Sequence, residues 1–246
     1  MKTSERQHLK HDEISDTLQQ AYARFDKNRS IATTVVGAVL IVAVIAGGLY
    51  WYRSHRADEA AGLLAQALTI TEAQVVPPVQ ALPGQPAPPP PPPGSYPSER
   101  AKLEAAIPKF EATADQYPST DAGLFARYRA GAALATLDRM ADARAQYQKL
   151  VDSDGQGLYG RMAKLALAQC DVQDKKYDAA IATLRDLSLD AKGDLPVDAI
   201  LLQLGQAYVA AGKTTEARQT FERVTTEFAT SPYAADAKKQ LDALKG

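Results

Sequence analysis

Small and bulky residues recur with a spacing of 37 residues through the second half of the chain. Each copy has a small residue, then an alanine twelve positions later, then a bulky residue four positions after that. A small residue lets two antiparallel helices approach closely, and the bulky one fills the space beside it. One such helix pair cannot bury its apolar face alone, so the repetition predicts stacked pairs. The nine positions are Gly131, Ala143 and Tyr147, then Ala168, Ala180 and Leu184, then Gly205, Ala217 and Phe221.

The last copy is the most complete and carries further residues of a known signature. On its first predicted helix, Leu-Gly is followed three residues later by tyrosine, and a Gly-Lys-Thr turn leads to a second helix with alanine and phenylalanine. This pattern resembles the tetratricopeptide repeat, with Leu201 standing where tryptophan is usual. The signature residues of this copy are Leu204, Gly205, Tyr208, Ala217 and Phe221.

The resemblance implies an all-α solenoid of about three and a half helix pairs with a closing helix. One period before the first full copy, Ala106 and Phe110 predict a second helix whose first helix is missing from its expected place. Pro108 lies inside that helix and is expected to kink or split it. The middle copy is the weakest, because Lys164 and Asp171 replace its first bulky residue and its aromatic residue. The expected units are 121–153, 158–190 and 195–228, followed by a closing helix at 233–244, all within a repeat domain at 98–246.

Residues 31–52 contain no charged residue, and their centre is an apolar run from Val35 to Ile45. As a helix this stretch is about 33 Å long, enough for a hydrocarbon core of about 30 Å. An aromatic triplet that ends at Tyr52 fits the aromatic belt of a membrane surface. The alternative is a buried helix of a soluble protein, but no repeat helix is so free of polar residues. The sequence therefore predicts one transmembrane helix.

The charges on either side of this stretch predict its orientation. Six Lys or Arg residues precede it, whereas only Arg53 and Arg56 follow it before Arg100. The positive-inside rule then places the N-terminus in the cytoplasm and the repeats outside the cytoplasmic membrane, which is the periplasm in a bacterium with two membranes. The leader is about thirty residues long, and no small residues mark a cleavage point, so we expect an uncleaved signal anchor.

Two further segments flank the predicted span. Residues 1–30 form a cytoplasmic segment in which Ile14, Leu18, Tyr22 and Phe25 share one helical face. This short amphipathic helix either lies on the membrane or docks a partner, or it has no partner at all. Residues 53–76 predict a juxtamembrane helix that extends the span outward and is a candidate for the missing first helix.

A proline-rich segment at 77–97 holds eleven of the fifteen prolines, including the unbroken run at 88–93. Such a run has a fixed φ and no N–H donors, so polyproline II is expected. One interpretation is a docking site for a groove lined by aromatic side chains. The other, which we favour from the sequence, is an insertion or spacer between two helices of a repeat.

Several classes of function receive no support from the residues. The net charge of −1 gives no basic face for nucleic acid. All three histidines lie at or before His55, so no histidine-based catalytic or zinc site is expected after it. The lone Cys170 reads as a buried apolar residue. The G-x-G-x-x-G match ending at Gly160 follows a predicted helix instead of a strand, so it reads as a loop. We therefore expect no catalytic residues, no metal and no cofactor.

Tetratricopeptide solenoids bind extended peptides or helices on the concave face that their first helices line, and this resemblance implies a mostly apolar, neutral surface here. No carboxylate clamp is expected, although Arg127 and Arg129 lie nearby. The implied partner-binding residues are Phe125, Tyr128, Met162, Leu165, Gln169, Leu202, Gln206 and Val209.

With its anchor, the chain resembles single-pass bacterial envelope proteins of the ancillary Sec-translocon-subunit type. That resemblance implies a non-enzymatic adaptor or chaperone-like scaffold, with translocon components or emerging envelope polypeptides as partners. One alternative is an assembly factor for outer-membrane or cell-wall machinery. Another is an enzyme whose site would show as converging carboxylates within 121–228. Homo-oligomers are a further possibility through the small residues Ala43 and Gly47 of the span.

Overall fold

The structure is a computed structural model that describes residues 29–79, 90–189 and 194–244, with side chains from residue 33 onward. The chain divides into two compact units, residues 1–55 and 56–246. The amphipathic helix expected at residues 14–25 lies outside the described residues.

The first unit contains the beginning of the helix α2, which runs Arg29–Glu72. The large apolar side chains from Val35 to Tyr52 are exposed, and the rings of Trp51 and His55 stack with centroids 5.5 Å apart. Among the described residues, α2 is the one helix that is long and apolar enough to cross a membrane, and none of its most apolar stretch is buried. Its length and composition make this stretch a candidate membrane span, and an N-terminal signal sequence has the same properties.

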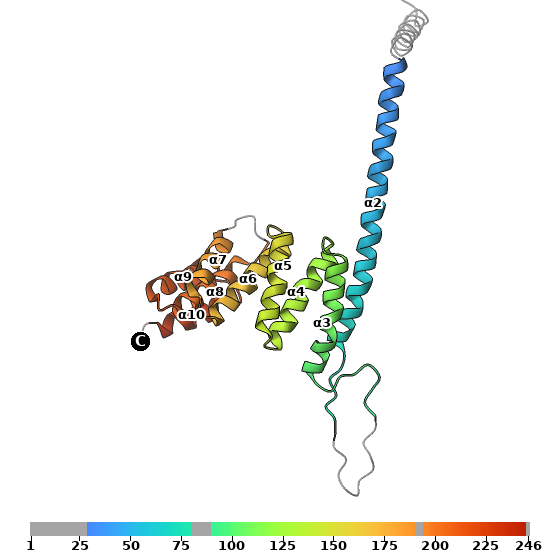
Figure 1. Ribbon diagram of the computed structural model, residues 1–246. Coiled ribbons are helices and arrows are strands. Elements are labelled where there is room, and N and C mark those ends of the chain that lie inside the picture. The colour runs from blue at the N-terminus through green and yellow to red at the C-terminus, as the bar shows by residue number, and fades with distance from the viewer. Residues whose placement is uncertain (1–28, 80–89, 190–193, 245–246) are drawn as a thin grey trace, which may run out of the picture. The chain divides into compact units, whose positions relative to one another are not determined.

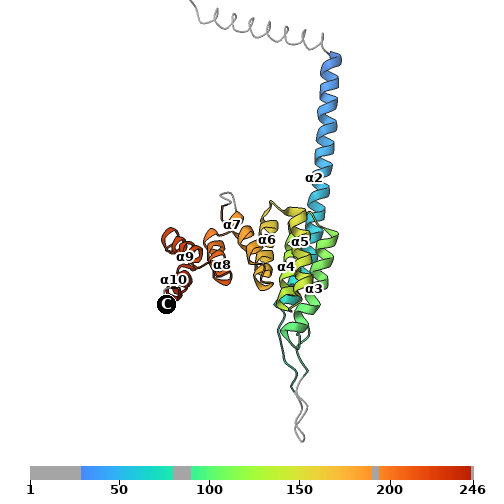
Figure 2. The same ribbon diagram turned by 60° about the vertical axis from the view of Figure 1, so that its left-hand side comes forward.

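The second unit is built from the last part of α2 and eight further helices among the described residues, in which each helix packs mainly against its neighbours in sequence (Figures 1 and 2). This arrangement confirms the all-α solenoid. The helices are α3 (Glu99–Gln116), α4 (Asp121–Thr136), α5 (Met140–Asp154), α6 (Leu158–Gln173), α7 (Tyr177–Leu189), α8 (Val197–Ala210), α9 (Thr214–Glu227) and α10 (Ala234–Ala243).

The same tight turn joins the two helices of three successive pairs. Each turn has three residues, and the middle one has a positive φ: Asp138 at 62°, Lys175 at 61° and Gly212 at 73°. In each turn the third residue donates its N–H to a carbonyl five residues earlier, as Lys213 does to Tyr208 over 2.8 Å. This left-handed cap satisfies carbonyls at the helix end and sends the chain back antiparallel. The left-handed residue therefore also recurs every 37 positions.

Small and bulky residues of the period face each other across each pair. A Cβ added to Gly131 would lie 2.6 Å from Cε1 of Tyr147, and one added to Gly205 would lie 2.3 Å from Cε1 of Phe221. In the middle pair the small position is Ala168, and the bulky residue is Leu184 instead of a ring. Glycine therefore occurs where a ring packs against the helix, and alanine occurs where leucine does.

The end of α2 pairs with α3. Ala67 lies five residues before the end of α2, as Gly131 does in α4, and it is fully buried in one apolar cluster with Phe110 of α3. Arg56 of α2 donates through Nη2 to the carbonyl of Gln116 over 2.5 Å. The hydroxyl of Tyr117 donates to Glu59 over 2.9 Å. The second unit thus begins at residue 56, whereas we expected the repeat domain to begin at 98.

The helix α3 differs from expectation at Pro108. It is a single helix from Glu99 to Gln116, so the proline does not split it. Pro108 is exposed, and a proline there removes only one N–H donor from the helix. At the start of α3, the hydroxyl of Ser98 accepts from the N–H of Ala101 over 3.1 Å and caps the first turn.

Candidate protein-binding surface

The predicted partner-binding residues lie on the first helices α4, α6 and α8 and differ in exposure. Gln169, Gln206 and Val209 are exposed. Leu202 is only 8% exposed and belongs to the apolar core, so we remove it from the candidate surface. The remaining predicted residues are half-buried: Phe125, Tyr128, Met162 and Leu165.

Aromatic rings gather where α4 meets α6. The rings of Phe125 and Tyr159 lie 6.0 Å apart, and those of Tyr128 and Tyr147 lie 5.9 Å apart. The guanidinium of Arg129 lies 6.0 Å from the Phe125 ring centroid. Burial raises the pKa of Tyr128 above its ordinary value, and its protonated hydroxyl can donate a hydrogen bond. This surface, the aromatic end, suits an apolar side chain that carries an acceptor.

Amide side chains gather at the other end, between α6 and α8. Nε2 of Gln169 donates to Oε1 of Gln203 over 3.0 Å, and Gln206 lies on the next turn of α8. Val209 is 39% exposed at the end of the same helix. Amides both donate and accept, so this surface, the amide end, suits the backbone of an extended peptide.

Two residues of this surface were not among those predicted from the sequence, although the repeat pattern indicates both. Tyr159 lies one helical turn before Met162, and Gln203 lies one turn before Gln206. Leu64 and Leu68 of α2 correspond to positions on α4 once Ala67 is matched to Gly131. The insertion between α2 and α3 breaks the period there, which hid this correspondence.

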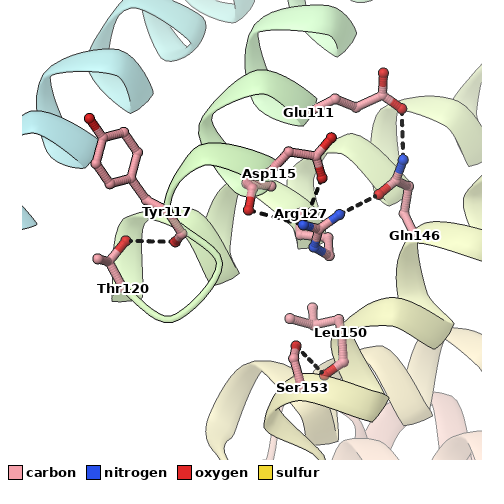
Figure 3. A network of polar contacts seen from close by, with 9 residues as sticks. Glu111, Asp115, Tyr117, Thr120, Arg127, Gln146, Leu150 and Ser153 are labelled. Carbon is pink, nitrogen blue, oxygen red and sulfur yellow. Dashed lines mark hydrogen bonds and ion pairs between the residues drawn. The ribbon is translucent and has the colours of Figure 1, made fainter. Parts of the chain in front are cut away.

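The side chain of Arg127 is held by hydrogen bonds within the fold. Its guanidinium donates to the Ala114 carbonyl over 3.0 Å, to Asp115 over 2.9 Å and to Oε1 of Gln146 over 3.1 Å (Figure 3). Nε2 of Gln146 donates in turn to Glu111 over 2.7 Å. These bonds join α3, α4 and α5 around a side chain that is 7% exposed. Arg127 therefore has little capacity to hold a partner's carboxylate.

The repeat position of Arg127 is filled differently in the next two pairs. One period on, Nζ of Lys164 donates to the Gly155 carbonyl over 2.7 Å beside an open cleft of about 490 Å³. Leu187 and Thr183 of α7 line the same cleft. A further period on, Leu201 is completely buried in the apolar core. The middle pair therefore has an open cleft at a position where the last pair has a buried leucine.

The described residues contain no group of three or more metal-ligating side chains. The glycines that end at Gly160 lie between α5 and α6, where the N–H of Gly160 donates to Oδ2 of Asp154 over 3.1 Å. They form a turn between helices, with no strand before them. Cys170 is buried, and burial raises the pKa of its thiol, which makes it a poor nucleophile.

Comparisons with known proteins agree with this geometry. The sequence profile of the tetratricopeptide repeat-like domain matches residues 25–246. None of the curated proteins compared with the chain matches it. A crystal structure of nearly identical TPR-like repeats from Podosopora anserina, in a protein described as a kinesin light chain, is similar to this chain. The identity is 16% and the TM-score is 0.50, and the match covers 58% of this chain and 77% of that one. A second structure of the same repeats gives 16% identity, the same coverage and a TM-score of 0.49. This likeness concerns the fold alone. Tetratricopeptide repeats are scaffolds for protein–protein interaction, and this chain belongs to the tetratricopeptide repeat-like family.

Proposed function

We propose that the chain is a membrane-anchored scaffold of the bacterial cell envelope that binds other proteins through its repeats. The observation that carries the proposal is the combination of two features in one chain. A repeat unit of a protein-binding family follows a helix long and apolar enough to span a membrane. The positive charges before that helix support a cytoplasmic N-terminus, a signal anchor at 31–52 and a repeat domain in the periplasm.

The proposed binding surface consists of the aromatic end and the amide end. Its half-buried apolar residues, such as Phe125 and Leu165, would hold apolar side chains of an extended segment. Gln169 and Gln206 would bond to the backbone of the same segment. A surface that is apolar and rich in amides fits emerging envelope polypeptides better than one fixed charged ligand. This supports a role as an adaptor or chaperone-like subunit near the Sec translocon.

An assembly factor for outer-membrane or cell-wall machinery is the second candidate. The same surface would then hold one folded or extended partner permanently, and the two roles differ in how many partners are bound. The repeats fit a non-enzymatic role, in agreement with their family.

Site-specific photo-crosslinking in intact cells tests the proposal. The probes replace Tyr128 and Gln206 one at a time in the full chain, and a matched probe replaces Gln219, which is exposed on the second helix α9. We expect crosslinks from the first two positions to translocon components or to varied envelope polypeptides, and none from Gln219.

Two results would change this conclusion. A single fixed partner at both positions would favour the assembly factor. An equal pattern from all three positions would show that the surface is not the binding site.

Orientation has its own test. Protease added to spheroplasts should degrade the repeats, while a tag at the N-terminus stays protected until the cells are lysed. Protection of the repeats in spheroplasts would overturn the proposed topology.

A further inference from the structure

The connection between α2 and α3 is far longer than the fold requires. Three other helix pairs are joined by turns of three residues each. Here the chain runs from Glu72 to Glu99, and the residues between these two glutamates carry no charge. Long insertions in a compact domain are uncommon and usually have a function of their own. The repeat fold alone therefore does not explain this segment.

The two ends of the insertion are fastened together. Val75 and Tyr96 form a parallel backbone bridge. The N–H of Tyr96 donates to the Gln74 carbonyl over 2.9 Å, and the N–H of Val76 donates to the Tyr96 carbonyl over 2.9 Å. The two described ends of the segment therefore lie side by side next to the helix pair (Figure 1). The interpretation favoured from the sequence, an insertion or spacer between two helices of a repeat, stays a prediction and gives the segment no role of its own.

The described parts of the insertion form two exposed proline arms, residues 77–79 and 90–93. Val79 is 71% exposed. Beside the bridge the arms enclose a shallow groove of about 320 Å³, which Pro78, Pro91 and Tyr96 help to line. At the end of the second arm, Gly94 has a φ of 78°, and the N–H of Ser95 donates to the Pro92 carbonyl over 3.1 Å. This turn directs the second arm back to the bridge.

We propose that these two proline arms dock into a groove on a partner protein. That groove is shallow, uncharged and lined by aromatic side chains of the partner. Proline has a fixed φ, so a proline arm loses little conformational entropy when it binds. Closing the ends of the loop reduces that loss further. Proline rings pack flat on aromatic faces, and the unpaired carbonyls of polyproline accept hydrogen bonds from Trp or Tyr. The absence of charge between Glu72 and Glu99 excludes recognition by ion pairs within the insertion.

The test uses the full chain in its native membrane. A photo-crosslinking residue replaces Val79, which is exposed on the first arm, and the crosslinked residues of the partner are mapped by mass spectrometry. A synthetic peptide of residues 86–97 competes for the partner, and a peptide with Pro90, Pro91 and Pro92 replaced by alanine serves as control. We expect crosslinks to aromatic residues of one partner, reduced at least fivefold by the first peptide and unchanged by the second.

A matched variant separates docking from folding. The triple variant carries Pro90→Ala, Pro91→Ala and Pro92→Ala together with the crosslinker at Val79. Its crosslink to the partner protein should be lost. Its thermal unfolding should match that of the chain with the same crosslinker and intact prolines, because the replaced side chains lie outside the helix core. No crosslink from Val79 in the chain with intact prolines, a crosslink to lipid, to a second copy or to α4–α9, or no competition by the proline peptide would each overturn the proposal. The proposed repeat surface is read from Tyr128 and Gln206, so the two proposals can fail separately.

Discussion

The middle helix pair and the last one use the same repeat positions to different effect. In the last pair, Gly205 admits the ring of Phe221, and Leu201 is completely buried. In the middle pair, the corresponding residues are Ala168, Leu184 and Lys164, and a cleft remains beside the lysine. A repeat thus tolerates loss of its signature when the small and bulky positions change together. Packing volume, more than residue identity, is what the period preserves.

The largest expected effect compares one position in two pairs. Leu201→Ala removes a completely buried side chain and should lower the free energy of unfolding of residues 56–246 by about 3 kcal/mol. Lys164→Ala removes a partly exposed side chain beside a cleft and should cost less than about 1 kcal/mol. Urea denaturation measures both. Equal losses would show that the two pairs are packed equally well.

The second effect concerns the close approach of the two helices. Gly205→Ala places a Cβ 2.3 Å from the Phe221 ring, so the ring or the helix must move, at a cost of about 2 kcal/mol. Gly62→Ala in α2 is the matched control, because nothing lies within 4 Å of its added Cβ. The control should be neutral or stabilise by up to about 1 kcal/mol through helix propensity. If both variants behaved alike, the ring would not depend on the glycine.

The third effect tests whether small and bulky positions are coupled. Leu184→Phe alone should destabilise the middle pair by about 1.5 kcal/mol, because Ala168 leaves less room than glycine. Adding Ala168→Gly should restore about 1 kcal/mol of that loss, which a double-mutant cycle isolates. A coupling energy near zero would contradict the exchange of Ala–Leu for Gly–ring.

The smallest effect compares the pair α4–α5 with the pair α8–α9. Tyr147 of the former occupies the repeat position of Phe221 in the latter. Burial raises the pKa of the Tyr147 hydroxyl above its ordinary value of about 10. The stability linked to this neutral hydroxyl is complete below pH 10 and is lost above it, because the unfolded chain then releases its proton first. Between pH 8 and 10.5 the wild type should lose roughly 1 kcal/mol more than Tyr147→Phe. Parallel urea curves at the two pH values provide the measurement, and identical losses would exclude Tyr147 as the cause.

Much of the fold was predictable because its rules are local. The turn, the small residue and the bulky residue of each pair lie within about twenty positions, so Gly205 and Phe221 identify their pair from sequence alone. The pair formed by α2 and α3 was harder to predict, since an insertion separates Ala67 from Phe110 and breaks the period. The backbone bridge between Val75 and Tyr96 could not be predicted from the sequence, because backbone hydrogen bonds do not depend on side-chain type.

The candidate surface was less predictable than the fold. Position in the repeat identifies which residues line the first helices, but it does not give their exposure. Leu202 and Gln206 both matched the expected face, yet one is buried and the other is exposed. Arg127 matched the place of an apolar residue, and its network with Asp115 and Gln146 depends on three different helices. Long-range contacts of this kind are set by packing between pairs.

The central claim is that the end of α2 completes the repeat domain. Thermal unfolding of residues 56–246 compared with residues 98–246 tests it most directly. Removing α2 exposes the face formed by Ala106, Phe110 and Ala114, which are completely buried. We expect residues 56–246 to unfold cooperatively and residues 98–246 to unfold about 10 °C lower, with dye binding to the exposed face. Equal unfolding temperatures without dye binding would contradict the claim and return the start of the domain to residue 98.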